Sequence, residues 1–299
     1  MALEHYIGCS GWSYDGWKGP FYPVDLVNKY WLSYYSQIFD FVEIDSTFYR
    51  MPSHYMVNNW SKRTPDNFRF AVKFPKVVTH DKRLKDVGKD IEKFYDVMEP
   101  LYDKILVLLM QLPPSLQIAE GLDLLKNLQY LLDPSFRYAI EVRHYSWFNE
   151  LFYNYLKEKN YCLVWSQQDI LVTPPVLTTD FLYLRLIGDR SIDERDFGNI
   201  KRDRTREMEL WTNILKDIQK NEKSVKNAIV AANNHYAGFG PMTAKLYAEM
   251  IRLENKIRPF PIIDYKIPIS IDSSIFENDR IYKKYKTKTR QTDMSEFFR

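Results

Sequence analysis

The chain has 299 residues, a formal net charge of +3 and a globular composition. Its length allows one large α/β domain or two smaller ones, and the small charge excludes a fold that is strongly basic throughout. The longest aliphatic run, residues 105–110, is too short to cross a bilayer, and residues 1–8 lack the apolar stretch of a signal peptide. Cys9 and Cys162 lie in apolar runs, which favours buried reduced thiols over a disulfide framework. We therefore expect a soluble cytoplasmic protein with no membrane partner.

Short apolar runs alternate along the chain with segments of helical periodicity. The runs predict strands at residues 5–9, 41–45, 68–73, 104–110, 137–143, 161–165, 181–186 and 227–232. Helical patterns occur at residues 24–37, 54–63, 89–101, 121–132, 147–159, 203–220 and 242–253. Eight such units predict an α/β fold of the (β/α)8, TIM-type barrel class over residues 1–265, followed by an extended C-terminal tail over residues 266–299. A doubly wound open sheet is the alternative, but the first strand-to-helix junction lacks the Gly-x-Gly-x-x-Gly pattern of dinucleotide folds.

The strand expected at residues 41–45 carries carboxylates on one face. Alternation places Val42 and Ile44 on one side, and Glu43 and Asp45 on the other. Because helical segments flank this strand and should cover its apolar side, we expect both carboxylates to face the barrel interior. In such barrels, inward residues near the carboxyl ends of the strands line the ligand pocket.

Charged residues also occur near the ends of later strands. By the same alternation Lys73, Glu141, Arg143 and Arg185 face inward beside small or aromatic residues. With the two carboxylates of the earlier strand they form a balanced set of three acids and three bases, which we interpret as the candidate catalytic residues. The alternative is a structural ion network that closes the barrel mouth, because buried charges need partners and perturbed ionic clusters mark both kinds of site.

The loop after the first strand, residues 8–23, is rich in glycine and aromatic residues. Its four glycines permit unusual backbone conformations, and its rings offer flat faces on which a sugar or a base could stack. A rigid aromatic plug over the barrel mouth is the alternative. Among these rings Trp12 is the candidate ligand contact.

Several motifs follow one another from about Tyr6 to Asn234. They are Gly-Cys-Ser-Gly-Trp-Ser-Tyr from residue 8, Val-Glu-Ile-Asp-Ser-Thr-Phe-Tyr-Arg-Met-Pro from 42, Phe-Ala-Val-Lys-Phe-Pro from 70, Thr79-His80, Gln-Leu-Pro-Pro from 111, Glu-Val-Arg-His from 141, Tyr-Leu-Arg-Leu from 183 and Asn233-Asn234. Together they resemble the YecE-like family, a domain of unknown function (number 72). The resemblance implies a TIM barrel similar to endonuclease IV and sugar-phosphate isomerases, and a suggested role in DNA repair. The residues that it offers for nucleic-acid binding are Trp12, Tyr49, Arg50, His80, Asn233 and Asn234.

Two positions depart from the usual pattern of that family. Asp45 stands where members usually carry Asn, which adds a carboxylate. Ile187 stands where they usually carry His, which removes an imidazole from the barrel mouth. A mechanism that needs that histidine is therefore not expected here.

The residue types allow several chemistries. The acids and histidines that could hold a metal form no recognised ligand motif, which argues against zinc, while magnesium bound through Glu43, Asp45 or Glu141 stays open as a cofactor. No nucleophile elbow supports Ser-His-Asp chemistry. Lys73, Arg143 and Arg185 could instead clamp a phosphodiester, with Glu141 or Glu43 as general base.

The end of the chain changes in character. Residues 280–290 form a basic run that contains no Asp or Glu. The residues after it include Gln291, Met294, Phe297 and Phe298. The spacing of these four residues resembles the PIP box, a peptide that binds DNA sliding clamps of the PCNA type. The alternative is that the two phenylalanines pack on the barrel.

These features together predict a DNA-processing enzyme. We expect a phosphodiester-cleaving nuclease that acts in DNA repair or replication, with DNA and a PCNA-type sliding clamp as partners. One alternative is a small-molecule enzyme of the sugar-phosphate isomerase or hydrolase kind. Another is a clamp-associated nucleic-acid-binding protein without turnover.

Overall fold

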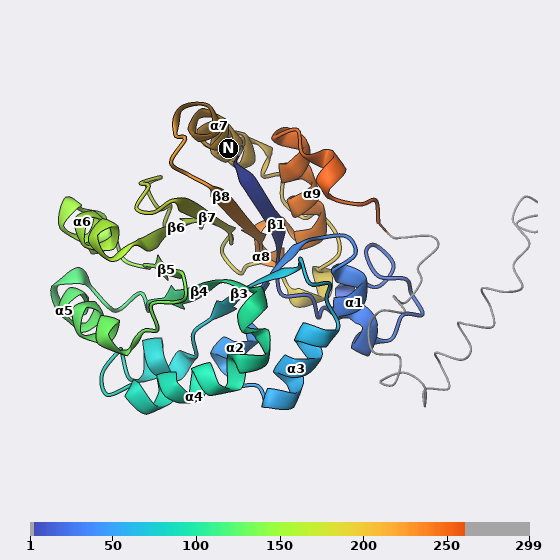
Figure 1. Ribbon diagram of the computed structural model, residues 1–299. Helices are drawn as coiled ribbons and strands as arrows, with labels where there is room; N and C mark the ends of the chain where they lie inside the picture. Colours follow the sequence, from blue (N-terminus) through green and yellow to red (C-terminus); the bar gives the residue numbers. More distant parts are fainter. Residues whose placement is uncertain (1–2, 261–299) are drawn as a thin grey trace, which may run out of the picture. The chain divides into compact units, whose positions relative to one another are not determined.

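The barrel is closed by eight parallel strands in chain order (Figure 1). The computed structural model describes residues 3–260. Its strands are β1 (Glu4–Ser10), β2 (Phe41–Ile44), β3 (Arg69–Lys73), β4 (Ile105–Gln111), β5 (Tyr138–Glu141), β6 (Tyr161–Gln167), β7 (Phe181–Leu186) and β8 (Asn227–Ala232). β8 pairs with β1 from Glu4↔Asn227 to Cys9↔Ala232, which closes the sheet. The predicted (β/α)8 fold is confirmed, with each strand within a few residues of its expected place.

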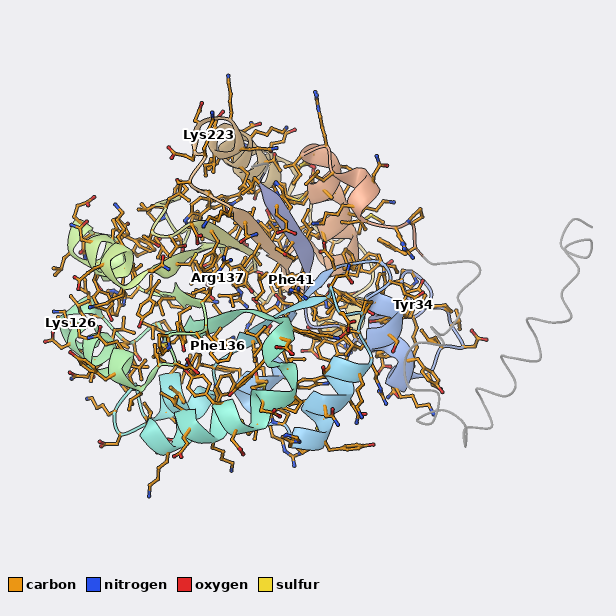
Figure 2. The ribbon with its side chains drawn as sticks, viewed as in Figure 1. Tyr34, Phe41, Lys126, Phe136, Arg137 and Lys223 are labelled. Atoms are coloured by element: carbon orange, nitrogen blue, oxygen red, sulfur yellow. The ribbon has the colours of Figure 1, made fainter. Side chains whose placement is uncertain are left out.

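Helices surround the barrel. The longer ones are α3 (His54–Lys62), α4 (Gly88–Met98), α5 (Ile118–Leu128), α6 (Glu150–Lys159), α7 (Thr205–Asn221) and α9 (Gly240–Met250). Short helices are α1 (Trp31–Tyr35), α2 (Ser46–Tyr49) and α8 (Asn234–Ala237). Short 3-10 helices are η1 (Asp15–Trp17), η2 (Asn28–Tyr30), η4 (Glu99–Lys104), η5 (Gln129–Leu131), η6 (Tyr145–Trp147), η7 (Glu194–Asp196) and η8 (Glu254–Lys256), and η3 (Val77–Asp81) is a π-helix. Figure 2 shows Phe41 inside the barrel, whereas Lys126 and Lys223 extend from its periphery.

The barrel interior is an apolar core beneath a charged layer. Alternate residues of the strands point inward and form one buried cluster: Phe41, Ala71, Val107, Leu109, Ala139, Cys162, Val164, Phe181, Tyr183, Ile229 and Ala231. One step nearer the carboxyl ends, the inward residues become Glu43, Lys73, Glu141 and Arg185, all buried. Both cysteines are free and buried, as expected. The strand pattern therefore places apolar residues in the middle of the barrel and ionic residues under its mouth.

Some elements differ from their expected limits. The helix expected at residues 24–37 shrinks to η2 and α1, because the segment before it turns back on itself, with the Leu26 amide donating to the Pro23 carbonyl and Trp31 Nε1 donating to the Leu26 carbonyl at 3.1 Å. The strand expected to reach Arg143 ends at Glu141, whose carbonyl accepts the amide of Leu112.

Two loops at the barrel mouth touch through glycines. Gly198 has φ of +103°, and a β-carbon there would lie 2.0 Å from the carbonyl oxygen of Gly16. A β-carbon at Gly16 would lie 2.2 Å from the carbonyl oxygen of Phe197. Side chains are therefore excluded at both positions, and the loop after β1 and the loop after β7 meet backbone to backbone.

The chain divides into a unit of residues 1–265 and a unit of residues 266–299. The second unit lies outside the described residues, so the predicted clamp-binding segment with Gln291, Met294, Phe297 and Phe298 stays a prediction. Within residues 3–260, no helix is long and apolar enough to span a membrane.

Candidate active site

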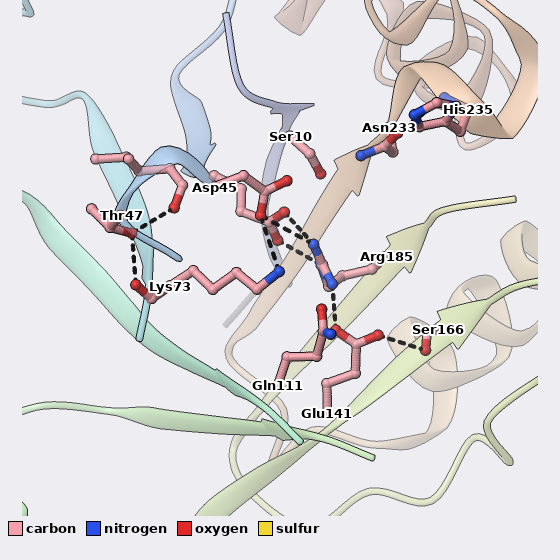
Figure 3. A network of polar contacts seen from close by, with 12 residues as sticks. Ser10, Asp45, Thr47, Lys73, Gln111, Glu141, Ser166, Arg185, Asn233 and His235 are labelled. Carbon is pink, nitrogen blue, oxygen red and sulfur yellow. Dashed lines mark hydrogen bonds and ion pairs between the residues drawn. The ribbon is translucent and has the colours of Figure 1, made fainter. Parts of the chain in front are cut away.

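Arg185 is the centre of the charged layer (Figure 3). From β7 its Nε donates to Glu43 Oε2 at 2.6 Å and its Nη2 to Glu43 Oε1 at 2.5 Å, a bidentate pair between strands. Its Nη1 donates to Glu141 Oε2, and Tyr183 OH donates to Glu43 Oε2. Burial opposes the charge of Arg185, but Glu141 and Glu43 outweigh it and hold the pKa of the guanidinium well above its ordinary value.

A second arginine, Arg143, binds the other carboxylate oxygen of Glu141. Arg143 lies just past β5, and its Nη2 approaches Glu141 Oε1 at 2.5 Å. Ser166 Oγ donates to the same oxygen at 3.1 Å. Burial alone would raise the pKa of Glu141, but Arg143 and Arg185 outweigh burial, so this pKa lies below its ordinary value. Glu141 is therefore a carboxylate whose oxygens are both occupied.

Arg143 is also held by two side-chain amides. Its Nη2 donates to Gln111 Oε1 at 3.2 Å, and its Nη1 donates to Gln168 Oε1. Its Nε is buried without a hydrogen-bond partner among the described residues. One edge of this guanidinium is thus left unsatisfied.

Asp45 and Lys73 are less satisfied than the other charges. Asp45 Oδ1 lies 3.6 Å from Lys73 Nζ and 3.5 Å from Arg185 Nη2, beyond good hydrogen-bond distance, and it is a buried oxygen without a hydrogen bond among the described residues. Burial would raise the pKa of Asp45, but Lys73 and Arg185 together lower it below its ordinary value. Burial lowers the pKa of Lys73 more than Asp45 raises it.

The chain beyond β2 keeps these two residues in place. Asp45 is the residue before α2, and Thr47 of that helix is fully buried. Thr47 Oγ1 donates to the carbonyl of Lys73 at 2.6 Å and approaches the carbonyl of Ile44 at 3.1 Å (Figure 3). The hydroxyl therefore ties the end of β3 to the end of β2.

A cavity of about 1360 Å³ opens above the charged layer. Its lining includes four of the predicted catalytic residues and four of the predicted nucleic-acid contacts: Asp45, Lys73, Arg143, Arg185, Trp12, Tyr49, His80 and Asn233. Trp12 is partly buried, with its ring 5.7 Å from that of Trp60 in an edge arrangement. His80 Nδ1 lies 2.8 Å from Thr79 Oγ1, and burial together with Lys73 lowers the pKa of His80 to about 4. His80 is therefore neutral near pH 7.

Other predicted residues lie elsewhere. Glu43 and Glu141 are buried beneath the cavity and are not part of its lining. Asn234 is buried in a structural position, where its Oδ1 accepts from Trp17 Nε1 and from the Gly240 amide. Arg50 is exposed outside the lining. Within residues 3–260, no three His, Cys, Asp or Glu side chains are grouped so that they could hold a metal ion.

The cavity also contains residues that the sequence did not single out. Lys76 follows β3 by three residues, and Arg190 follows Gly188 in the loop after β7. Burial lowers the pKa of His235, and the charge of Arg190 lowers it further. The sequence feature that could have identified Lys76 and Arg190 is their position shortly after the end of a strand. Loops after strands contain many charged residues that line no cavity, so this feature alone does not select them.

Fold and site together define a class of protein: a closed (β/α)8 barrel with an ionic cavity at the carboxyl ends of its strands. The sequence model described as "Protein of unknown function DUF72" matches residues 6–262, so the chain belongs to that family. It is 32% identical over 146 residues to UPF0759 protein YecE of Escherichia coli (strain K12) and 28% identical over 159 residues to UPF0759 protein YunF of Bacillus subtilis (strain 168). These matches span 48% and 50% of this chain, and only about half the length of each relative, 50% and 54%.

Solved structures of the same family share the fold. A DUF72 family protein of Thermotoga maritima MSB8 superposes with a TM-score of 0.72 at 29% identity, over 83% of this chain and 99% of that one. A DUF72 family protein of Enterococcus faecalis V583 superposes with a TM-score of 0.67 at 20% identity, over 85% of this chain and 99% of that one, which shows the fold alone.

The prediction of a DNA-processing nuclease recruited by a sliding clamp is wrong. The matching family is described as one of unknown function, and the names of these relatives and structures mention neither a nuclease nor a clamp. The physical argument for a phosphodiester clamp also weakens, because Arg185 is bound by Glu43 and Glu141, and Arg143 by Glu141. Charges neutralised in this way bind a phosphate less strongly than free ones.

Proposed function

We propose that this chain is a small-molecule enzyme whose barrel cavity binds an anionic, oxygen-rich substrate of the sugar-phosphate class. The observation that carries the proposal is the charge of the cavity lining, which contains six Lys and Arg residues against three Asp and Glu residues. Even with the two glutamates beneath it, the cavity keeps an excess of positive charge. The cavity volume of about 1360 Å³ exceeds the ~300–1,000 Å³ of typical small-molecule sites, so loops at its rim have room to close on a ligand.

The anionic end of the ligand would meet cations at the rim. Arg190 is exposed and has no ion-pair partner within residues 3–260, and its charge acts on Arg143 as well as on His235. Lys76 reaches the rim from the other side and pairs with the exposed Asp81 at 2.7 Å, an ion pair that is weak in water. Lys76 and Arg190 are therefore available to a phosphate, unlike Arg185, which is bound by glutamates in the floor of the cavity.

The polar body of the ligand would meet amides and one indole. Gln111, Gln168 and Asn233 line the cavity and can donate to and accept from hydroxyl groups. Trp12 offers a flat apolar face at the rim, supported by Trp60 behind it. A few polar groups beside an aromatic wall are typical of sites that bind small polar molecules.

The chemistry of the site would be proton transfer. Asp45 is a carboxylate with an unsatisfied oxygen at the cavity, and His80 is a neutral imidazole on the same lining. The Asp45 carboxylate can accept a proton, and the His80 imidazole can accept or donate a hydrogen bond. Such a pair suits isomerisation or hydrolysis of a sugar phosphate. Glu43, Glu141 and Arg185 hold the floor of the site in place.

The proposal can be tested by ligand-dependent unfolding. The full-length protein is heated with dihydroxyacetone phosphate, glucose 6-phosphate, the matching unphosphorylated sugars or inorganic phosphate. We expect at least one phosphorylated sugar to raise the unfolding temperature, since a ligand at ~100 times its Kd adds ~2.7 kcal/mol. Arg190→Ala should remove this response, and Lys126→Ala, an exposed change outside the cavity lining, should keep it.

Two results would overturn the proposal. The first is the absence of any response to the whole panel. The second is an equal response in Arg190→Ala, which would place the ligand elsewhere. Each sugar that binds is then incubated with the protein and followed by phosphorus and proton NMR, and conversion of none of them would contradict an enzymatic role.

A further inference from the structure

Lys73 differs from an ordinary buried lysine in what surrounds its nitrogen. Its side chain is only 5% exposed, yet Nζ donates no hydrogen bond within the described part of the chain. Its neighbours are Asp45 Oδ1 at 3.6 Å and the ring of Phe48, whose centre lies 4.3 Å away. Figure 3 shows the side chain extending from β3 toward the centre of the ionic cluster.

Lys104 provides the comparison within the same barrel. It is also buried, but its Nζ donates to the Ser61 carbonyl at 2.8 Å, to the Thr64 carbonyl at 2.7 Å and to Thr64 Oγ1 at 3.3 Å. A buried ammonium that serves structure is satisfied in this manner, because an unsatisfied one is costly. Lys73 lacks such acceptors and lines the cavity, so its nitrogen is available to a ligand.

Resting on the proposed function, we infer that Lys73 is a catalytic amine that forms an imine with the carbonyl group of an open-chain sugar phosphate. A lysine that is desolvated and close to another cation is the usual form of such a nucleophile, and Arg185 is that cation here. Phe48 covers one side of the nitrogen, which limits the access of water. The substrate class thus narrows to phosphorylated aldehydes and ketones.

The step balances with the groups present. The nitrogen lone pair of the neutral amine attacks the carbonyl carbon and forms the C–N bond. The carbonyl oxygen takes both protons of the amine and leaves as water, so the product is the imine and one water. Asp45 is the group placed to carry these protons, since its free Oδ1 faces the lysine nitrogen. No oxidant, reductant or metal is needed.

Burial supports this role because it lowers the pKa of Lys73. Each unit by which an amine pKa falls raises its neutral fraction at pH 7 about tenfold. Lys126, in contrast, is exposed and lies outside the cavity lining. Lys73 should therefore react with a carbonyl compound in preference to surface lysines.

The test is reductive trapping with dihydroxyacetone phosphate as the probe. The full-length protein is incubated with the probe at pH 7, borohydride is added to reduce any imine to a stable secondary amine, and the site of modification is mapped by peptide mass spectrometry. We expect labelling of Lys73 to exceed that of Lys126 at least ~tenfold. Lys73→Arg, which keeps the charge, should lose this adduct, and inorganic phosphate should compete with it.

Thermal unfolding of the same samples separates this inference from the proposed function. A probe that raises the unfolding temperature of the wild type without labelling Lys73 would overturn the imine and leave the binding site standing. A probe that neither binds nor labels, when every other sugar phosphate also fails, would overturn both. Equal labelling of Lys73 and Lys126, or an adduct that survives in Lys73→Arg, would show nonspecific chemistry and sink the inference.

Discussion

The six charged residues at the barrel mouth divide into two groups by how well they are satisfied. Glu43, Glu141 and Arg185 bind one another, whereas Asp45, Lys73 and Arg143 keep atoms without hydrogen bonds among the described residues. The sequence could predict that all six face inward, because strand alternation alone decides that. It could not predict which are structural, since that depends on distances between four different strands. These contacts support the structural interpretation for the first group, and the catalytic interpretation stays a proposal for Asp45 and Lys73.

Arg185→Met tests the structural group. It should lower the free energy of unfolding by about 3–5 kcal/mol, because it leaves Glu43 and Glu141 buried without their partner. Chemical denaturation measures this change. Arg195→Met is the control, since Arg195 is exposed and its loss should change the free energy of unfolding little. Equal stability of the two variants would contradict the structural role.

Trp12→Ala tests the rim of the cavity. We expect the affinity for a sugar phosphate to fall by about 1 kcal/mol, five- to tenfold, because one apolar wall of the site is removed. The unfolding temperature should change little, since only one edge contact with Trp60 is lost. Titration calorimetry gives the affinity, and Trp12→Phe should retain most of it. Unchanged affinity in Trp12→Ala would assign the ring to packing.

At the scale of elements, the sequence predicted strands better than short helices. Each strand has a buried apolar run that alternation makes visible, and all eight were found. The helices α2 and α8, of four residues each, are too short to show a period of 3.6 residues. Both nevertheless follow strands at the mouth, so the unpredicted elements are those that shape the cavity. Contacts such as the bond from Thr47 to Lys73 fix α2, and they join residues distant in sequence.

Thr47→Val tests the connection between α2 and β3. Valine has nearly the same shape but no hydroxyl, so the carbonyl of Lys73 loses a donor and stability should fall by about 1–3 kcal/mol. Because that carbonyl fixes the end of β3, trapping of Lys73 by the carbonyl probe should fall as well. Thr47→Ser keeps the hydroxyl and should preserve the trapping. A valine variant with undiminished trapping would show that Lys73 is held by other contacts.

At the scale of the molecule, burial has made the fold sensitive to acid. His5 in β1 is buried, its Nδ1 has no partner among the described residues, and burial together with Lys256 lowers its pKa from 6.5 to about 4. The unfolded chain therefore binds more protons than the folded one between those values. The free energy of unfolding therefore rises with pH in this range. Neutral His5 stabilises the fold fully above pH 6.5, and this contribution is lost as the pH falls toward 4.

The buried carboxylates Asp45 and Glu141 affect stability in a lower pH range. The pKa values of Asp45 and Glu141 lie below their ordinary values of 3.8 and 4.5, so their contribution is present above those values and is lost as the pH falls through the lower folded-state pKa. Acid unfolding should therefore proceed in two ranges. Histidine titration dominates the upper range and carboxylate protonation dominates the lower one.

His5→Leu separates the two ranges. Leucine keeps an apolar side chain in the buried position but cannot titrate, so the loss of unfolding free energy between pH 6.5 and 4, about 3 kcal/mol from this residue, should disappear. The loss below pH 4 should remain, because Asp45 and Glu141 are unchanged. Urea denaturation at several pH values gives the slope, which is read independently of any constant change in stability. His54→Gln, at an exposed histidine, is the control. An unchanged slope in His5→Leu would mean that this side chain is charged or hydrated in the folded protein, and that the acid sensitivity between pH 6.5 and 4 comes from other histidines whose pKa values are lowered, His80 and His235.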